Sequence, residues 1–557
     1  MAVSKSIAVP KAFQPDERQR QAIEHVHGPM LVVAGAGTGK TTVLTRRVAR
    51  LIRDGHAHPD EILALTYTDN AAREMGDRVR AELRGMDLSG LRCRTFHAYC
   101  NELLIKNGKQ FGVLDDKDLW IYLRRRIREL HLNYFVRAAN VSKFLDDLLD
   151  FMRRCHDELA GPEKYAEYVR RLERGEIMVP RVCKSKDLGT LSDDEVIARC
   201  REISRVYSAV ERMLQDENLG TFGHMITRAY HLLRGDSVLL SEEQKRAHFL
   251  LVDEFQDVNF AQVKVLQQLA GGPRNVFAVG DPDQAIYQFR GASSAAFGLF
   301  EDHFPGAKLV VLEKNRRSTT PILRSAFAVI SKNPEAFADE KAAAYQRAPL
   351  VSARDEEEVP QGPQAPRVPV EVVLLTHKDV ECSDLATVIE RQKRQTRCGW
   401  GDFAVLYRQH SHRDELVDEL LGRDIPFSIE NMDVLDTPEV RDLLACLGAV
   451  VSPSDGASLF RVAALPPFVI DPDKLRAGMR ALPFGAPSSG VARVLGEIEG
   501  GKAVLETLQQ VRDEIASAGV KARAALETIL RRFALPRAPS VQAVLEFAAA
   551  WEGKPLT

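Results

Sequence analysis

The sequence predicts an α/β protein with more than one domain, and three observations support this class. Short apolar segments alternate with helical stretches between residues 13 and 110, as in the strand–helix–strand units of a parallel sheet. A glycine-rich loop joins the first apolar segment to the first helix. At 557 residues the chain is also too long for one hydrophobic core. Its length suggests roughly three or four domains.

The first α/β region begins with two apolar segments and the helix between them. "MLVVAG" (30–35) and "EILALTYT" (61–68) have the continuous apolar character of buried parallel strands. "GKTTVLTRRVARLIRDG" (39–55) has the periodicity of a helix. The order strand, loop, helix, strand is that of a parallel-sheet lobe.

After residue 110 the α/β pattern gives way to a helical pattern, and strand signals return near residue 247. Residues 115–220 carry apolar positions at helical spacing among many charges. Strand signals return in "AHFLLVDEF" (247–255) and "NVFAVGD" (275–281). The simplest topology is an α/β lobe that is interrupted by a helical insertion of about a hundred residues and then resumed.

A second lobe is predicted after an acidic and then proline-rich segment, residues 353–371, which we expect to be an exposed linker. "VEVVLLTH" (370–377) and "DFAVLYRQ" (402–409) are predicted strands of this lobe. From about residue 447 the sequence is again mainly helical.

The composition limits the class of protein. No apolar stretch approaches the roughly 20 residues of a membrane helix, and the N-terminus lacks a secretory signal pattern. We therefore expect a cytoplasmic protein without a membrane partner. The eight cysteines include no C-x-x-C pair, which favours reduced thiols over a cysteine metal site. The net charge of −2 neither supports nor excludes nucleic-acid binding.

The first chemical motif is a phosphate-binding loop. A-GAGT-GKT (34–41) follows the pattern G-x-x-x-x-G-K-[ST], with Ala34 in place of the first glycine. The glycines let backbone amides turn onto phosphate oxygens, and the helix N-terminus adds partial positive charge. Lys40 would reach the β- and γ-phosphates, and the Thr41 hydroxyl would bind Mg²⁺. We assign nucleotide binding to Ala34, Gly35, Ala36, Gly37, Thr38, Gly39, Lys40, Thr41 and Thr42. The structural alternative is a glycine-rich turn before an ordinary helix.

Two acids end the strand in "FLLVDEFQD" (249–257). Nucleotide hydrolysis needs one carboxylate for the metal and another to orient the attacking water. Asp253 is the expected Mg²⁺ ligand and Glu254 the expected base, although a solvated strand end would have the same pattern. No N-K-x-D segment that would recognise guanine occurs, which favours ATP.

A third motif is "AVGDPDQAIYQFRGA" (278–292). Gln284 is expected to sense the γ-phosphate. Tyr287, Phe289 and Arg290 have the residue types that stack single-stranded bases and hold their backbone. For each ring alone, filling of the core is the alternative.

The order of these motifs resembles that of the UvrD/PcrA/Rep family of superfamily 1 DNA helicases. "FQPDERQRQAI" (13–23) is similar to the family's Q motif, which implies that Gln19 reads adenine. "DEFQD" and "GDPDQAIYQFRGA" resemble its Walker B and coupling motifs. The resemblance implies contacts with single-stranded DNA from Thr66, Tyr67 and Asn70 in "ALTYTDNAAREM" (64–75) and from Phe96 and His97 in "TFHAYC" (95–100).

"LEKNRRST" (312–319) resembles the family's N-Y-R-S-T. The resemblance makes Arg317 the γ-phosphate arginine. Arg316 stands where the family has a tyrosine that stacks on adenine, so we expect a looser adenine preference. We assign no role to His224 in "GTFGHM".

The resemblance implies a P-loop NTPase with two RecA-like parallel-sheet lobes, each with a mainly helical insertion. The expected domains are a first lobe (1–110 and 221–315), its insertion (111–220), the N-terminal part of a second lobe (316–446) and a partial second insertion (447–557). It also implies an ATP- and Mg²⁺-dependent 3′→5′ helicase that acts on single-stranded DNA and single/double-strand junctions.

Two family motifs have no counterpart in the sequence, an H-x-x-K-G-L-E-like and a Y-V-x-x-T-R-A-like segment, the second of which carries the arginine finger. We therefore expect the N-terminal part of a longer helicase, with an incomplete second lobe and little ATPase on its own. DNA repair or recombination is the expected pathway. The alternatives are a motor subunit of a RecB/AddA-like helicase–nuclease, with repair or nuclease proteins as partners, and a non-catalytic ATP-responsive DNA-binding protein.

Overall fold

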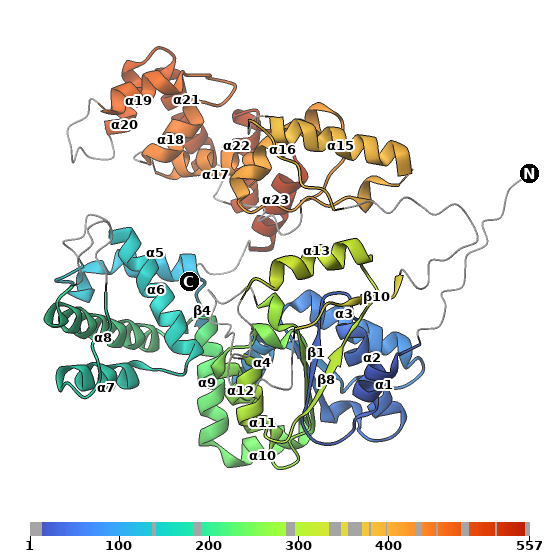
Figure 1. The fold of residues 1–557 in the computed structure, drawn as a ribbon. Coiled ribbons are helices and arrows are strands. Elements are labelled where there is room, and N and C mark those ends of the chain that lie inside the picture. Colours follow the sequence, from blue (N-terminus) through green and yellow to red (C-terminus); the bar gives the residue numbers. More distant parts are fainter. Residues whose placement is uncertain are drawn as a thin grey trace, which may run out of the picture. The chain divides into compact units, whose positions relative to one another are not determined.

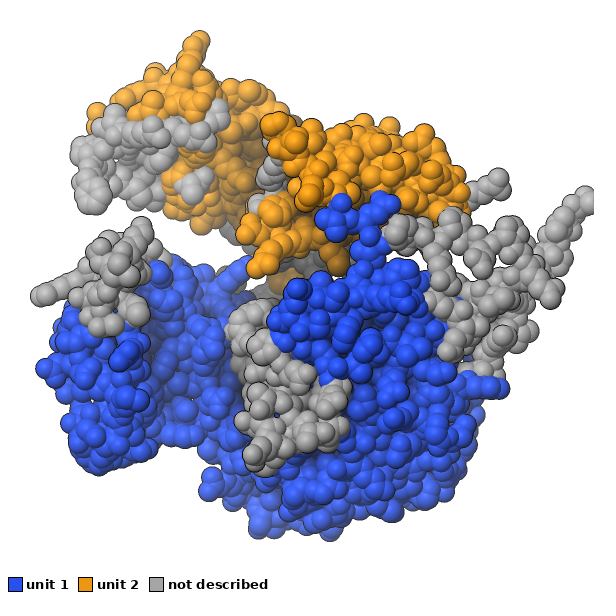
Figure 2. Space-filling model, viewed as in Figure 1, with its two compact units in different colours: residues 1–372 blue, residues 373–557 orange. Residues whose placement is uncertain are grey.

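The structure is a computed structural model that forms two compact units, residues 1–372 and 373–557 (Figure 2). The described residues are 14–135, 141–182, 191–285, 296–333, 347–354, 370–377, 380–396, 398–429, 437–452, 455–480, 490–517 and 521–551. None of the helices in these ranges combines the length and the apolar character that a membrane-spanning helix needs.

The first unit is built on a six-stranded, fully parallel sheet in the order β3-β2-β6-β7-β1-β8 (Figure 1). Its strands are β1 (Met30–Ala34), β2 (Ile62–Thr66), β3 (Arg92–Thr95), β6 (Phe249–Val252), β7 (Val276–Gly280) and β8 (Lys308–Leu312). In β1, Met30 pairs with Phe277 of β7 on one side and with Lys308 of β8 on the other. The mixed α/β class with a parallel sheet is thereby confirmed.

Helices cover both faces of this sheet, and alternate residues of each strand face opposite sides. Met30 and Val32 of β1 pack against one set of helices, whereas Leu31 and Val33 pack against the other. The first set is α1 (Glu17–Glu24), α2 (Lys40–Arg53) and α3 (Asp69–Glu82). The second set is α4 (Phe96–Lys106), α9 (Phe222–Gly235), α10 (Ser237–Arg246), α11 (Phe260–Ala270) and α12 (Ala296–His303).

A mainly helical segment leaves the lobe and returns to it through a short parallel pair, β4 (Gly112–Val113) and β5 (Leu219–Gly220). It has its own apolar core, which includes Leu145, Tyr207 and Val210. Its helices are α5 (Asp116–Arg125), η2 (Ile127–Leu130), α6 (Val141–Asp157), α7 (Pro162–Glu173) and α8 (Asp193–Asp216). The domain boundaries stated above stay a prediction.

After β8 the chain continues into β9 (Lys314–Asn315) and α13 (Thr320–Ile330), and β9 pairs with β10 (Val351–Ser352). Three short 3₁₀ turns lie next to strands of the sheet. η1 (Pro59–Glu61) precedes β2, η3 (Phe255–Asp257) follows β6, and η4 (Pro282–Gln284) follows β7. η3 and η4 carry polar residues of the site described below.

The second unit is helical over its described residues. Its larger apolar core includes Leu443, Val462 and Ile529. Its helices are α15 (Glu381–Thr396), η8 (Trp400–Asp402), α16 (His410–Gly422), α17 (Pro438–Val451), α18 (Gly456–Ala463), α19 (Pro472–Arg480), α20 (Gly490–Glu497), α21 (Gly501–Ser517), α22 (Ala522–Arg532) and α23 (Pro539–Trp551).

The strands predicted at 370–377 and 402–409 do not form, and this prediction is wrong. Both segments are described, yet neither carries strand pairing. Leu374 is 90% exposed and Leu406 is 95% exposed, so their side chains lack the cover of a buried parallel strand. An apolar run becomes a strand only when a neighbouring strand satisfies its backbone groups. The second parallel-sheet lobe therefore remains a prediction.

Candidate active site

The phosphate-binding loop connects the carboxyl end of β1 to the first turn of α2. Gly37 and Gly39 have φ angles of 75° and 90°, which favour glycine. A Cβ at Gly37 would also lie 2.7 Å from the Cβ of Arg317. Gly39 is the N-cap of α2 and has no side chain to satisfy the first amides of the helix. Those amides can therefore donate to an anion.

Lys40 follows at once and is almost fully buried, with 9% of its surface exposed. Its Nζ donates to Oε2 of Glu254 over 2.7 Å. Gln256 Nε2 donates to the same oxygen, also over 2.7 Å. The structure thus brings together the lysine predicted for the phosphates and the acid predicted as the base.

Glu254 is held in an uncommon backbone conformation. Its φ of 48° is left-handed, which costs a residue with a side chain about 1 kcal/mol or more. The residue caps η3, the turn that follows β6. This turn directs Glu254 toward Lys40 of the phosphate-binding loop and places Gln256 beside Glu254.

Asp253 follows β6 directly and is buried close to the Thr41 hydroxyl. Burial raises the pKa of Asp253 to about 6, and the charge of Glu254 adds to this rise. A hydroxyl and a carboxylate are oxygen ligands of the kind that Mg²⁺ prefers. The residues present therefore fit the predicted metal.

Two further acids were missed by the sequence reasoning. Asp257 of η3 has its pKa raised to about 6 by burial and by Glu254, and its Oδ1 is buried without a hydrogen-bond partner among the described residues. Asp281 follows β7, and burial raises its pKa as well. A divalent cation would relieve the repulsion that Glu254 exerts on Asp253 and Asp257. Their signal was present in the sequence, because each stands just beyond a strand.

Gln256 connects the segment after β6 to the segment after β7. Its Oε1 accepts the backbone N–H of Asp281 over 2.8 Å, while its Nε2 binds Glu254. Asp281 in turn accepts from Gln284 Nε2 over 2.6 Å. A continuous chain of polar contacts therefore runs from Lys40 to Gln284, the residue predicted to sense the γ-phosphate. Gln256 was not singled out from the sequence, although it lies within "DEFQD".

Gln19 lies on α1, is fully buried and contacts the phosphate-binding loop. Its side chain completes a capping box with Asp16, and its Nε2 donates to the carbonyl of Thr38 over 2.8 Å. The Arg316 guanidinium lies 3.2 Å from Gln19 Oε1 and 3.4 Å from Asp16 Oδ2. Arg316 thus lies beside the glutamine predicted to read adenine.

Asn315, also missed, fixes the segment that carries Arg316 and Arg317. Its Nδ2 donates to the carbonyl of Ala36, and its Oδ1 accepts the backbone N–H groups of Arg317 and Ser318 over 2.8 and 2.7 Å. The N–H of Arg316 donates to the carbonyl of Gly37 over 2.8 Å. The predicted γ-phosphate arginine is therefore tied to the phosphate-binding loop within the first unit.

The predicted DNA contacts lie at the ends of β2 and β3. Thr66 is buried and its hydroxyl has no hydrogen-bond partner among the described residues, whereas Tyr67 and Asn70 are exposed. His97 is half-buried, and its ring meets that of Phe222 edge-on at 5.7 Å. Burial lowers the pKa of His97, so its ring is neutral at neutral pH.

The prediction that Phe96 faces DNA is wrong. Phe96 is 5% exposed and begins the inward face of α4, followed at helical spacing by Tyr99, Cys100 and Leu103. This i, i+3, i+4, i+7 pattern buries the ring in the core beneath the sheet. Tyr287, Phe289 and Arg290 lie outside the described residues.

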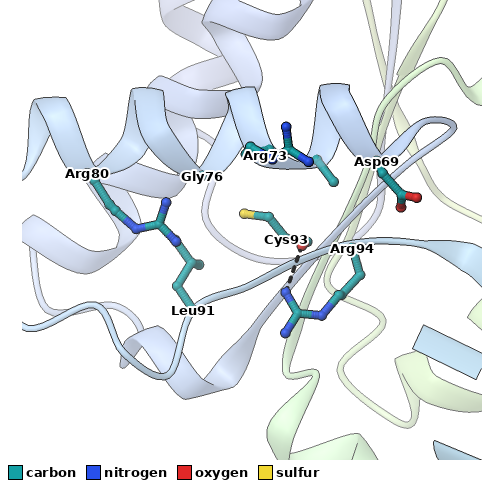
Figure 3. A pocket seen from close by; sticks show the side chains of 8 residues that line it. Asp69, Arg73, Gly76, Arg80, Leu91, Cys93 and Arg94 are labelled. Carbon is teal, nitrogen blue, oxygen red and sulfur yellow. Dashed lines mark hydrogen bonds between the residues drawn. The ribbon is translucent and has the colours of Figure 1, made fainter. Parts of the chain in front are cut away.

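A pocket of about 260 Å³ lies between α3 and β3, beside the predicted DNA contacts (Figure 3). Arg80 pairs with Asp77, and Arg94 donates to the carbonyl of Cys93. Arg73 is exposed at the pocket rim. The pocket is lined by Asp69, Ala72, Arg73, Gly76, Arg80, Leu91, Cys93 and Arg94. Arg94 also pairs with Glu102 over 3.3 Å, so two of the three arginines already have carboxylate partners.

The sheet, the loop and the acids define a protein of the P-loop nucleotide-binding class. Residues 16–305 match the family model described as the UvrD/REP helicase N-terminal domain, and residues 310–477 match the UvrD-like helicase C-terminal domain. The first match covers more than half of the chain. The chain therefore belongs to the UvrD/Rep helicase family.

Three relatives with similar sequences are each named as an ATP-dependent DNA helicase. The chain is 28% identical over 461 residues to "ATP-dependent DNA helicase PcrA" of Leuconostoc citreum, covering 81% of this chain and 54% of the relative. It is 29% identical over 471 residues to "ATP-dependent DNA helicase Rep" of Escherichia coli (strain K12), covering 82% and 61%. It is 29% identical over 458 residues to "ATP-dependent DNA helicase PcrA" of Bacillus subtilis (strain 168), covering 80% and 54%. The matches thus span between about half and three fifths of these relatives.

Proposed function

We propose that the protein is an ATP- and Mg²⁺-dependent DNA helicase that translocates 3′→5′ along single-stranded DNA. The observation that supports this best is the polar chain from Lys40 through Glu254 and Gln256 to Asp281. It links the phosphate-binding loop to the acids that hydrolysis needs. The names of the relatives supply ATP and DNA as the substrates to test.

The proposed roles of the ATP-binding residues follow from their positions. The amides at the start of α2 and the Lys40 ammonium bind phosphate oxygens, and Thr41 and Asp253 hold Mg²⁺. The metal, when bound, neutralises charge on the phosphates. Glu254 orients the attacking water and accepts its proton. Arg317 stabilises the charge that develops on the γ-phosphate.

The proposed coupling route begins at Gln256. This side chain binds both Glu254 and the backbone of Asp281. When Glu254 moves in response to the γ-phosphate, the hydrogen bond from Gln256 to the segment after β7 therefore changes as well. That segment leads through Gln284 to Tyr287, Phe289 and Arg290, the proposed base-stacking residues. Tyr67 and Asn70 would hold the same strand at the end of β2.

The proposed adenine recognition, DNA substrates, pathway and partners rest on the resemblance to the UvrD/PcrA/Rep helicases. Gln19 reads adenine, and Arg316 in place of the family tyrosine loosens that preference. The preferred substrates are single-stranded DNA and single/double-strand junctions, in repair or recombination in the cytoplasm. Repair or nuclease proteins are the proposed partners.

The test is ATP hydrolysis with and without single-stranded DNA, compared with an RNA oligonucleotide of the same sequence. It is run at high protein concentration, because we expect little ATPase from these 557 residues alone. We expect stimulation by DNA, and loss of turnover in Lys40→Ala. Lys109→Ala is the matched control, since Lys109 is exposed and lies just beyond the C-terminal end of α4. Equal turnover in Lys40→Ala and the parent protein would remove the assignment, and stimulation by RNA alone would change the substrate.

A further inference from the structure

A second polar cluster lies apart from the nucleotide site, in the helical part of the first unit. It involves helices α6, α8 and α9 (Figure 1). His156 stands near the end of α6, Glu211 on α8 and His224 in the first turn of α9. Both imidazoles are buried, whereas Glu211 is 20% exposed. The proposed ATPase mechanism uses none of these three residues.

The three side chains converge on one point. Glu211 Oε1 lies 3.1 Å from Nε2 of His156, and Glu211 Oε2 lies 2.9 Å from Nε2 of His224. One ligand atom from each residue lies within 4.8 Å of the other two. Bonds of about 2.0–2.2 Å to a tetrahedral zinc ion place ligand atoms roughly 3.3–3.6 Å apart. Small side-chain shifts would therefore close the cluster around an ion.

We propose that His156, Glu211 and His224 form a binding site for Zn²⁺. Two imidazole nitrogens and a carboxylate are a ligand set that suits zinc, whereas Mg²⁺ requires mainly oxygen ligands. The site is thus chemically distinct from the one at Thr41 and Asp253. Glu211 is partly exposed to solvent, so a water molecule would serve as the fourth ligand.

The surroundings of His224 contain the partner that a zinc-bound imidazole needs. Its Nδ1 lies 3.0 Å from both the backbone N and the Oγ1 of Thr221. In the hydrogen-bonded arrangement Nδ1 accepts the backbone N–H, and Nε2 donates its proton to Glu211. Zinc at Nε2 would displace that proton, so Nδ1 would have to carry the ring proton and donate it to Thr221 Oγ1, which orients the ring. The backbone N–H of Thr221 would then lose its bond to Nδ1.

The position of the site indicates a structural role. It joins α6 and α8 of the helical segment to α9, which packs against the sheet. The residue after His156, Asp157, accepts a 2.6 Å hydrogen bond from Asn259, the N-cap of α11. A bound ion would therefore fix the helical segment on the lobe that carries the acidic turn at 253–257.

The test uses the full 557-residue chain, treated with a chelator and then titrated with Zn²⁺. We expect one Zn²⁺ per chain by mass spectrometry, an increase in thermal stability, and a visible Co²⁺ spectrum without thiolate charge-transfer bands. His156→Gln and His224→Gln should each weaken binding about 100-fold or more. His231→Gln is the matched control, because His231 is exposed on the same helix α9.

Failure of the parent chain to bind Zn²⁺ would overturn the proposal, and so would unchanged binding in His156→Gln and His224→Gln. If either variant fails to fold, the Co²⁺ spectrum of the parent chain decides, since thiolate bands would assign the ion to cysteines. The binding assay needs no ATP turnover, so this proposal and the proposed helicase activity can fail separately.

Discussion

The Nζ of Lys40 lies 2.7 Å from Oε2 of Glu254 and joins the phosphate-binding loop to the turn after β6. The pair connects two segments separated by more than two hundred residues in sequence. Lys40 is nearly buried and Glu254 is held in a left-handed conformation. Such strain at a polar site is typical of residues that act in chemistry rather than in stability.

Replacing the proposed base tests its role directly. Glu254→Gln keeps the size of the side chain but cannot accept a proton, so we expect kcat for ATP to fall about 10²–10⁴-fold. Affinity for a nonhydrolysable ATP analogue should remain within about threefold of the parent value. Glu163→Gln, at an exposed position on α7, is the control. Full turnover in Glu254→Gln would exclude Glu254 as the base.

Gln256 is proposed to position Glu254 rather than to react. Gln256→Ala removes a donor to Glu254 and the acceptor for the Asp281 amide. We expect lower kcat with unchanged KM for ATP, and a loss of stability of about 1–3 kcal/mol from the unsatisfied buried amide. A rise in KM with unchanged kcat would instead indicate a binding role.

Asn315 ties the arginine segment to the loop. Asn315→Ala removes one donor to Ala36 and the acceptor for the amides of Arg317 and Ser318. We expect ATP affinity to fall about tenfold, because Arg317 loses its fixed place. Equilibrium titration with a fluorescent ATP analogue measures this. Unchanged affinity, with the fold intact by circular dichroism, would show that the segment contributes nothing to binding.

The buried carboxyl of Asp281 makes stability depend on pH. Burial raises its pKa in the folded state above the unfolded value, so the folded protein holds the proton more tightly. The stability that this proton provides is lost as pH rises through the raised pKa. Asp281→Asn cannot ionise, so its advantage over the parent protein should be larger near pH 8 than near pH 4 in urea unfolding without added metal. An equal difference at both pH values would contradict this.

Tyr67 and Phe96 should separate DNA binding from folding. Tyr67→Ala removes an exposed ring and should weaken binding to a single-stranded oligonucleotide by about 1–3 kcal/mol with little change in stability. Phe96→Ala should cost about 3–5 kcal/mol of stability through the cavity it leaves. Fluorescence anisotropy and thermal unfolding measure the two effects. The reverse pattern would return Phe96 to the DNA surface.

The first lobe could be predicted because its signals are local. The apolar run at 30–34, the glycines after it and the helix at 40–53 specify each other through short-range geometry. The strands at 249–252 and 276–280 were also found from their apolar runs. The strand at 92–95, in contrast, reads Arg-Cys-Arg-Thr, and only its pairing with β2 makes it a strand.

Long-range relationships could not be predicted in this way. Nothing in the sequence around Gln256 or Asn315 shows that their amides bridge separate strands. Phe96 was misassigned because the segment "TFHAYC" also begins the core-facing apolar pattern of helix α4. The segments 370–377 and 402–409 have a clear apolar pattern, yet they do not form strands. Within the described residues no neighbouring strand pairs with them.

The most direct test of the account is a crystal structure of the chain soaked with a nonhydrolysable ATP analogue and Mg²⁺. We expect phosphates on the amides of residues 35–41 and on Lys40, the metal on Thr41 and Asp253, and Arg317 at the γ-phosphate. An analogue bound elsewhere, or a loop in which Lys40 stays paired with Glu254 at saturating analogue, would contradict it.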